Sequence, residues 1–138
     1  MLSARLAALA DREHPGEILA RAVAYPYEAP LHSFVQTGPL SRELRAEELD
    51  LRGREPLLAY GSNAAPAVLA RKLAALPDVP LPVLRAALVD FDVVYSAHVS
   101  RYGSVPANLR ASPRAELPVF VLHLDAAQLD LIAPTEPN

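Results

Sequence analysis

The chain contains no cysteine, and only one of its 13 basic residues is a lysine, Lys72. Without cysteine, disulfide bonds, thiolate catalysis and cysteine-ligated metal sites are all excluded. The shortage of lysine is interpreted as a bias of the genome's base composition, with no bearing on activity. A net charge of −3 gives no reason to expect a nucleic-acid partner, which favours a basic face.

Long apolar runs are also missing. No stretch approaches the ~18 apolar residues that a membrane-spanning helix needs, and charges interrupt the N-terminal leucines too early for a signal peptide. We therefore expect a cytoplasmic protein without a membrane partner. The histidines His14, His32, His98 and His123 are far apart and have no metal-binding spacing, so we expect no metal.

The composition is that of a globular chain. Its 138 residues are enough for one full-sized domain, and hydrophobic residues make up 51% of them against 21% charged, which allows a buried core. The 14 prolines help to place the breaks between elements.

Residues 1–55 are predicted to form a helical and proline-rich N-terminal extension. Short helices are expected over residues 3–13 and 17–23, and residues 24–39 should be extended or looped. Ser41 resembles the N-cap of a polar helix that runs to about Leu51, with Gly53 as its stop.

Residues 56–138 are predicted to form the main domain. A buried strand over residues 56–60 leads into a helix that starts near Ala65, in which Val68, Leu69, Leu73 and Leu76 share one face while Arg71 and Lys72 point away. Three consecutive strands should follow, over residues 87–97, 104–112 and 116–124, and then a short helix capped by Asp125. Consecutive strands predict an antiparallel α+β fold rather than a doubly wound sheet.

The stretch "LLAYGSNAAPAVLARKL" (57–73) contains the most informative corner. A strand that turns into a helix leaves the first helical N–H groups without intrahelical acceptors, and these favour an anionic group or a developing oxyanion. Gly61 lets a ligand approach closely, and Asn63 can cap the helix or bond outward. The plainer alternative is an ordinary connection in which Ser62 and Asn63 only cap the helix.

This corner resembles the opening motif of the γ-glutamylcyclotransferase-like family, in which a strand ending in Tyr-Gly-Ser-Asn leads into the first helix. "ALVDFDVVYS", "GSVPANLRASP" and "LPVFVLHLDAAQLDLI" resemble the strands and short helix that follow in that family. The resemblance covers residues 56–138 and implies a mixed, partly barrel-shaped sheet with short helices. The family's closing strands are expected to be missing after "APTEPN". Either the domain over residues 56–138 is a C-terminally incomplete fragment, or closure comes from the N-terminal segment or from a second copy in a homo-oligomer.

The resemblance also implies an activity. Members of the family cyclise a γ-glutamyl group to 5-oxoproline and release an amine or amino acid, without a metal or organic cofactor. Carried over by motif, Glu136 is the catalytic acid–base residue, while Tyr60, Gly61, Ser62 and Asn63 bind the substrate. The sequence does not identify the leaving amine.

Two other functions compete with this one. Ser62 on its strand-to-helix turn could be a hydrolase nucleophile, but Tyr60 and Ala64 replace the flanking glycines of such an elbow. A protein that keeps the fold as a non-catalytic binding or assembly module, with contacts made by the N-terminal segment, is the second alternative.

Overall fold

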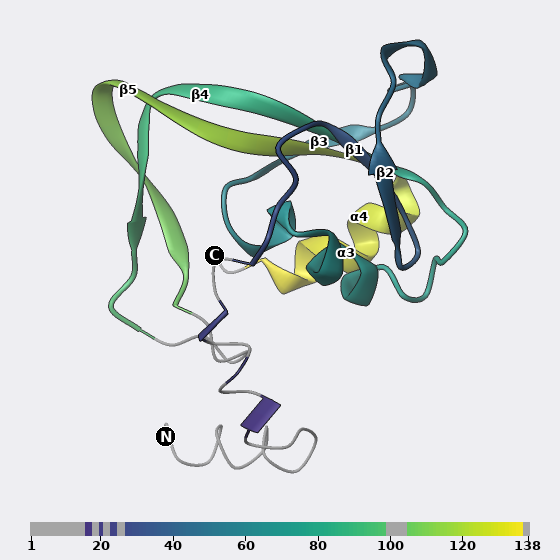
Figure 1. The fold of residues 1–138 in the computed structure, drawn as a ribbon, viewed down its shortest axis with the longest axis horizontal. Helices are drawn as coiled ribbons and strands as arrows, with labels where there is room; N and C mark the ends of the chain where they lie inside the picture. Colours follow the sequence, from purple (N-terminus) through teal and green to yellow (C-terminus); the bar gives the residue numbers. More distant parts are fainter. Residues whose placement is uncertain (1–15, 18–19, 21–22, 25–26, 99–104, 137–138) are drawn as a thin grey trace.

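A computed structural model describes residues 16–17, 20, 23–24, 27–98 and 105–136 (Figure 1). The helix predicted over residues 3–13 lies outside this described part, as does most of the one predicted over 17–23. The strands are β1 (Phe34–Thr37), β2 (Leu40–Glu43), β3 (Glu55–Ala59), β4 (Leu81–Tyr95) and β5 (Ala107–Leu124). The helices are α3 (Pro66–Lys72) and α4 (Ala126–Ile132), with 3-10 helices η1 (Ala46–Glu48), η2 (Ser62–Ala64) and η3 (Ala133–Thr135).

The strands form one sheet in the order β2-β1-β4-β5-β3. Every neighbouring pair is antiparallel, which confirms the α+β class but corrects the expectation of a mixed sheet. Strands β2 and β3 stand at opposite ends of this order, so the sheet is open and is not closed into a barrel. The β1–β2 hairpin explains one of these pairs, because a two-residue connection returns the chain alongside itself.

The helix predicted from Ser41 to Leu51 is wrong, because residues 40–43 form β2. The chain turns back at Gly38, which has φ +54°, and β1 then pairs with β4 on its other side. All four β2 side chains are exposed, so the segment has no alternation of buried and exposed residues that would predict a strand. Residues on the N-terminal side of position 55 therefore contribute two strands to the sheet.

Strands β4 and β5 are longer than predicted. Strand β4 begins at Leu81 rather than near Ala87, and the two strands expected over residues 104–124 are one continuous β5. Their register shifts between Val89 and Phe91, at a bulge where Asp90 has φ 66° and Arg114 has φ 68°. The Arg114 backbone N–H donates to Asp90 Oδ1 at 2.8 Å, which holds the bulge together.

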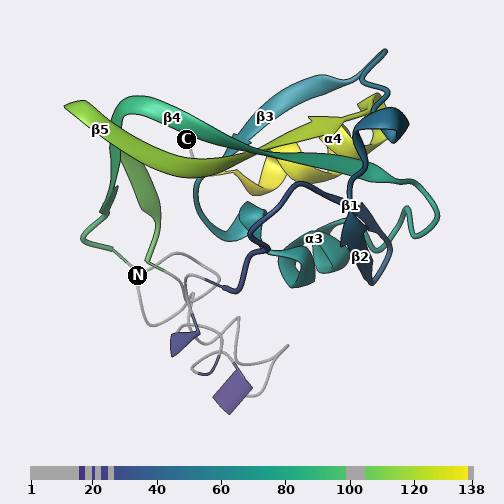
Figure 2. The same cartoon turned by 45° about the horizontal axis from the view of Figure 1, so that its top comes forward.

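Beyond Ala86, β4 pairs with β5 alone among the described residues. The two strands continue past the helices as a bent, two-stranded arm (residues 86–95 and 107–119), visible in Figures 1 and 2. Apolar side chains of this arm are exposed to solvent: Val89 is 59% exposed and Phe91 is 37% exposed.

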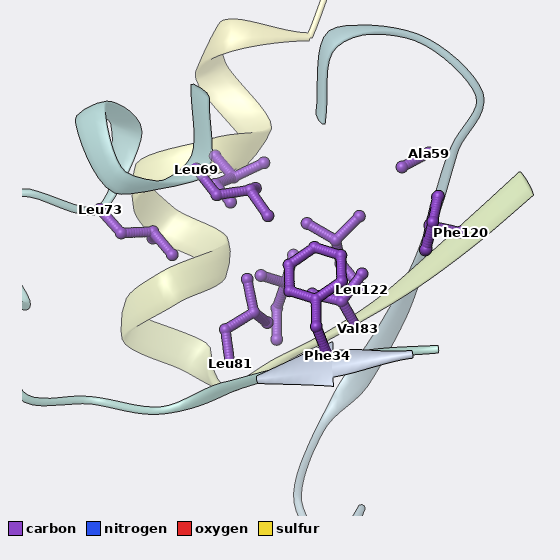
Figure 3. Close-up of a cluster of buried hydrophobic side chains, with 10 residues drawn as sticks. Phe34, Ala59, Leu69, Leu73, Leu81, Val83, Phe120 and Leu122 are labelled. Atoms are coloured by element: carbon purple, nitrogen blue, oxygen red, sulfur yellow. The ribbon is translucent and has the colours of Figure 1, made fainter. Parts of the chain in front are cut away.

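Both helices lie on the same face of the sheet (Figures 1 and 2). They enclose the core with the sheet, as Figure 3 shows, and the rings of Phe34 and Phe120 meet edge-to-face with centroids 5.7 Å apart. The predicted cap of α4 is confirmed, because Asp125 Oδ1 accepts the Gln128 backbone N–H at 2.8 Å. The core residues are Phe34, Ala59, Leu69, Leu73, Leu81, Val83, Phe120, Leu122, Leu124 and Ile132.

Candidate functional site

The chain does not pass directly from strand to helix at the corner after β3. Strand β3 ends at Ala59, and the 3-10 helix η2 intervenes before α3 begins at Pro66. Gly61 has φ −135° and ψ −136°, so the turn forms without the left-handed backbone that favours glycine. Tyr60, Gly61 and Ser62 are half-buried and Asn63 is buried.

The backbone N–H groups of this corner fall into two sets. Those of Ala64 and Ala65 donate to the carbonyl oxygens of Gly61 and Ser62, at 3.1 and 3.0 Å. Those of Gly61, Ser62 and Asn63 have no acceptor among the residues that the structure describes. They are donors that a bound oxygen atom can satisfy.

Asn63 does not cap a helix. Neither η2 nor α3 has a side-chain cap, so the plain reading of the corner, in which Ser62 and Asn63 only cap, is wrong. The Asn63 side chain instead makes two polar contacts while the residue is only 6% exposed. Its Nδ2 donates to Glu136 Oε1 at 2.5 Å, and its Oδ1 accepts from Lys72 Nζ at 2.7 Å.

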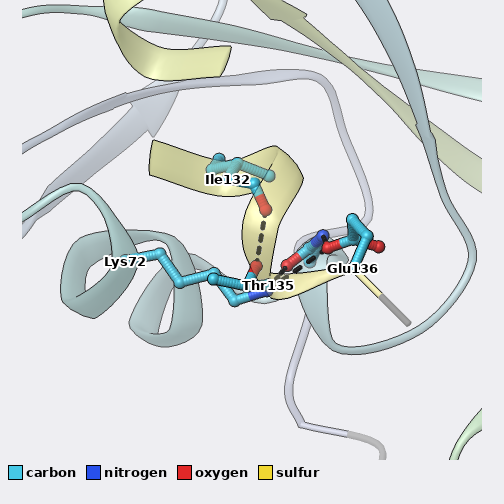
Figure 4. A network of polar contacts seen from close by, with 5 residues as sticks. Lys72, Ile132, Thr135 and Glu136 are labelled. Carbon is cyan, nitrogen blue, oxygen red and sulfur yellow. Dashed lines mark hydrogen bonds and ion pairs between the residues drawn. The ribbon is translucent and has the colours of Figure 1, made fainter. Parts of the chain in front are cut away.

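Glu136 lies at the corner because it directly follows α4 and η3, which bring the chain to this place. Ile132 at the end of α4 is fully buried, and its carbonyl oxygen accepts from Thr135 Oγ1 at 2.7 Å (Figure 4). The Glu136 backbone N–H donates to the Ala133 carbonyl at 3.2 Å, which completes η3. The carboxylate therefore lies directly against Asn63, 73 residues away in the sequence.

Lys72 joins the same contact. Its Nζ lies 3.4 Å from Glu136 Oε1, and its side chain is 16% exposed, against 36% for Glu136 (Figure 4). Burial lowers the pKa of Lys72, and the negative charge of Glu136 opposes that shift. We name Asn63, Lys72 and Glu136 the polar triangle.

The prediction that Lys72 points away from the buried face is wrong, and sequence reasoning missed it as a site residue. The helical pattern places it beside Arg71, which is exposed. The signal that could have found it is its rarity, since it is the only lysine among 13 basic residues. Base composition explains why arginine is common, but not why lysine stands at this position.

One hollow lies beside the corner. A cavity of about 460 Å³ is lined by Glu28, Ala29, Pro30, Pro66 and Ala67, so it opens against the start of α3. Neither Tyr60 nor Ser62 makes a side-chain hydrogen bond within the described residues, and neither contacts Glu136 in that way. Of the predicted side chains, the structure thus brings Asn63 into contact with Glu136. Within the described part of the chain it shows no hydrogen bond between Glu136 and the side chain of Tyr60 or Ser62.

Metal and membrane features are absent from the described residues. No group of three histidine, aspartate or glutamate side chains there is arranged to hold a metal ion. Within the same ranges no helix has the length and apolar character that crossing a membrane requires.

Comparison with known proteins does not assign this chain to a family. The resemblance to the γ-glutamylcyclotransferase-like family therefore remains a prediction from the corner motif and Glu136. No family model, no curated protein and no solved structure matches this chain.

Proposed function

We propose that this protein cyclises a γ-glutamyl group to 5-oxoproline and releases an amine or amino acid. The observation that carries the proposal is the 2.5 Å contact between Glu136 Oε1 and Asn63 Nδ2. The resemblance assigns substrate binding to the corner and acid–base chemistry to Glu136, which requires these distant residues to meet. If Glu136 were only a solvated tail carboxylate, it would not be expected to contact the buried side chain of Asn63.

The reaction needs little chemistry from the protein. The substrate's own α-amino nitrogen attacks the γ-carbonyl carbon, so a new C–N bond closes the ring while the original amide C–N bond breaks. Because nucleophile and electrophile belong to one molecule, holding them in a ring-closing pose supplies much of the rate enhancement. Glu136 takes the proton from the attacking nitrogen and passes it to the departing amine.

The corner supports this chemistry in two ways. Glu136 Oε2 has no hydrogen-bond partner within the described residues, so it is the oxygen free to accept the proton. The unsatisfied N–H groups of Gly61, Ser62 and Asn63 are suited to bind the carbonyl oxygen as negative charge develops on it. Tyr60 lines the same corner, and no step requires a metal or cofactor.

The test is release of 5-oxoproline from a panel of γ-glutamyl amines and γ-glutamyl amino acids. The E136Q variant keeps the size of the side chain and removes the base, so turnover should fall by about 10²- to 10⁴-fold. The control is E47Q, which changes an exposed glutamate in η1 and should retain full turnover. Equal turnover by E136Q would exclude Glu136 as the base. Binding of panel members without turnover by the wild-type chain would favour the binding module.

A further inference from the structure

We propose that Lys72 is a positioning residue that, with Asn63, fixes Oε1 of Glu136 and leaves Oε2 accessible. The inference rests on the proposed function, in which Glu136 acts as the base. It adds a residue that the family resemblance did not assign and states which oxygen of the carboxylate works.

The contacts of the carboxylate are one-sided. Asn63 Nδ2 and Lys72 Nζ both approach Oε1, at 2.5 and 3.4 Å. The two donors are joined to each other, since Lys72 Nζ also donates to Asn63 Oδ1 at 2.7 Å. The polar triangle therefore restrains the rotation of the Glu136 side chain, while Oε2 has no partner among the described residues.

A lysine suits this arrangement better than an arginine. An ammonium is a compact donor that can serve one oxygen, whereas a guanidinium commonly binds both carboxylate oxygens as a fork. The chain shows this alternative elsewhere: Arg52 donates from Nε to Asp50 Oδ1 at 2.9 Å and from its terminal nitrogen to Oδ2 at 2.7 Å. An arginine at position 72 would occupy the oxygen that the reaction needs.

Electrostatics make Lys72 and Glu136 depend on each other. Desolvation disfavours the charged form of Lys72, and so does the neighbouring Arg71 on the same helix. Glu136, delivered at the end of η3, is the anion that opposes both effects. These are the charged groups that face the ammonium within the described residues.

The first test does not depend on activity. With ¹³C-labelled lysine the protein gives one side-chain Cε signal, because Lys72 is the only lysine, and its pH titration can be followed without assignment. The E136Q variant should lower the titration midpoint further, since the favourable charge is lost. The E47Q variant should leave it unchanged. An unchanged midpoint in E136Q would show that the two side chains do not meet in solution and would overturn the proposal.

The second test separates positioning from charge. In K72M, kcat should fall by about 10- to 100-fold with KM changed less than about threefold, because a charged hydrogen bond to the base is lost. In K72R the charge remains, yet kcat should also fall because the fork covers Oε2. The matched control is R71M, which removes an exposed charge one residue away and should keep wild-type kcat.

The outcomes distinguish this inference from the proposed function. Turnover by K72R equal to that of the wild type would overturn the positioning role while leaving the proposed function intact. If the wild type turns over no member of the panel, the proposed function fails, and the lysine titration still decides whether Lys72 holds Glu136. Far-UV circular dichroism of each variant shows whether a loss of activity reflects unfolding.

Discussion

Replacing Phe34 with alanine should destabilise the whole sheet, because this residue packs the β1–β2 hairpin against the hydrophobic core. Phe34 lies in β1, is 0% exposed and meets the Phe120 ring at 5.7 Å. Truncating a buried phenylalanine costs about 3–5 kcal/mol, of which the aromatic contact accounts for about 0.5–1.5 kcal/mol. The total stability of a domain is only about 5–15 kcal/mol, so the loss is a large share of it.

The assay is urea unfolding of the full chain, followed by far-UV circular dichroism. The control is L40A in β2, where the side chain is 74% exposed, and it should change stability by less than about 0.5 kcal/mol. A loss below about 1 kcal/mol in F34A, or a major transition that the change leaves untouched, would refute the reasoning. The N-terminal extension predicted over residues 1–55 would then be separate from the domain over residues 56–138.

Three further predictions concern stability and use the same unfolding assay. G38A should cost about 2 kcal/mol or more, because φ is +54° and a Cβ would lie 2.7 Å from the Pro77 carbonyl oxygen; G53A, with φ +68° and open space, should cost less. D125A should cost about 1 kcal/mol, since the N-cap of α4 is lost, and equal stability would contradict the capping role. Burial, and secondarily Arg54, lower the pKa of His123, so the unfolded chain binds the proton more readily and stability should fall as pH drops through about 6.5. H123Q should make the unfolding free energy depend less on pH, whereas H98Q, which removes an exposed histidine, should leave that dependence unchanged. An unchanged pH dependence in H123Q would contradict the role given to His123.

Elements with a strong local signal could be predicted from the sequence. Helix α3 follows the spacing of Val68 and Leu69, which are both buried, and α4 begins where Asp125 caps it. Strand β3 also lies within one residue of its expected limits. For the two helices, the residues that fix the element are close together in the chain.

Features that depend on distant partners could not be predicted. Strand β2 is exposed along its whole length, and it is a strand because β1 pairs with it after the turn at Gly38. Local pattern could not place Lys72 in the polar triangle, because Glu136 comes from 64 residues away. The family resemblance suggested that the corner and Glu136 belong together, but it gave no partner for the carboxylate.

The bulge at Asp90 has a consequence for how the protein behaves at high concentration. In the arm, β4 and β5 each have a side with no third strand among the described residues, which is a template for aggregation. Because the register shifts between Val89 and Phe91, an incoming strand meets no long regular ladder of free N–H and carbonyl groups. A bulge of this kind makes the two open edges of the arm poorer templates for a further strand than a regular ladder would be.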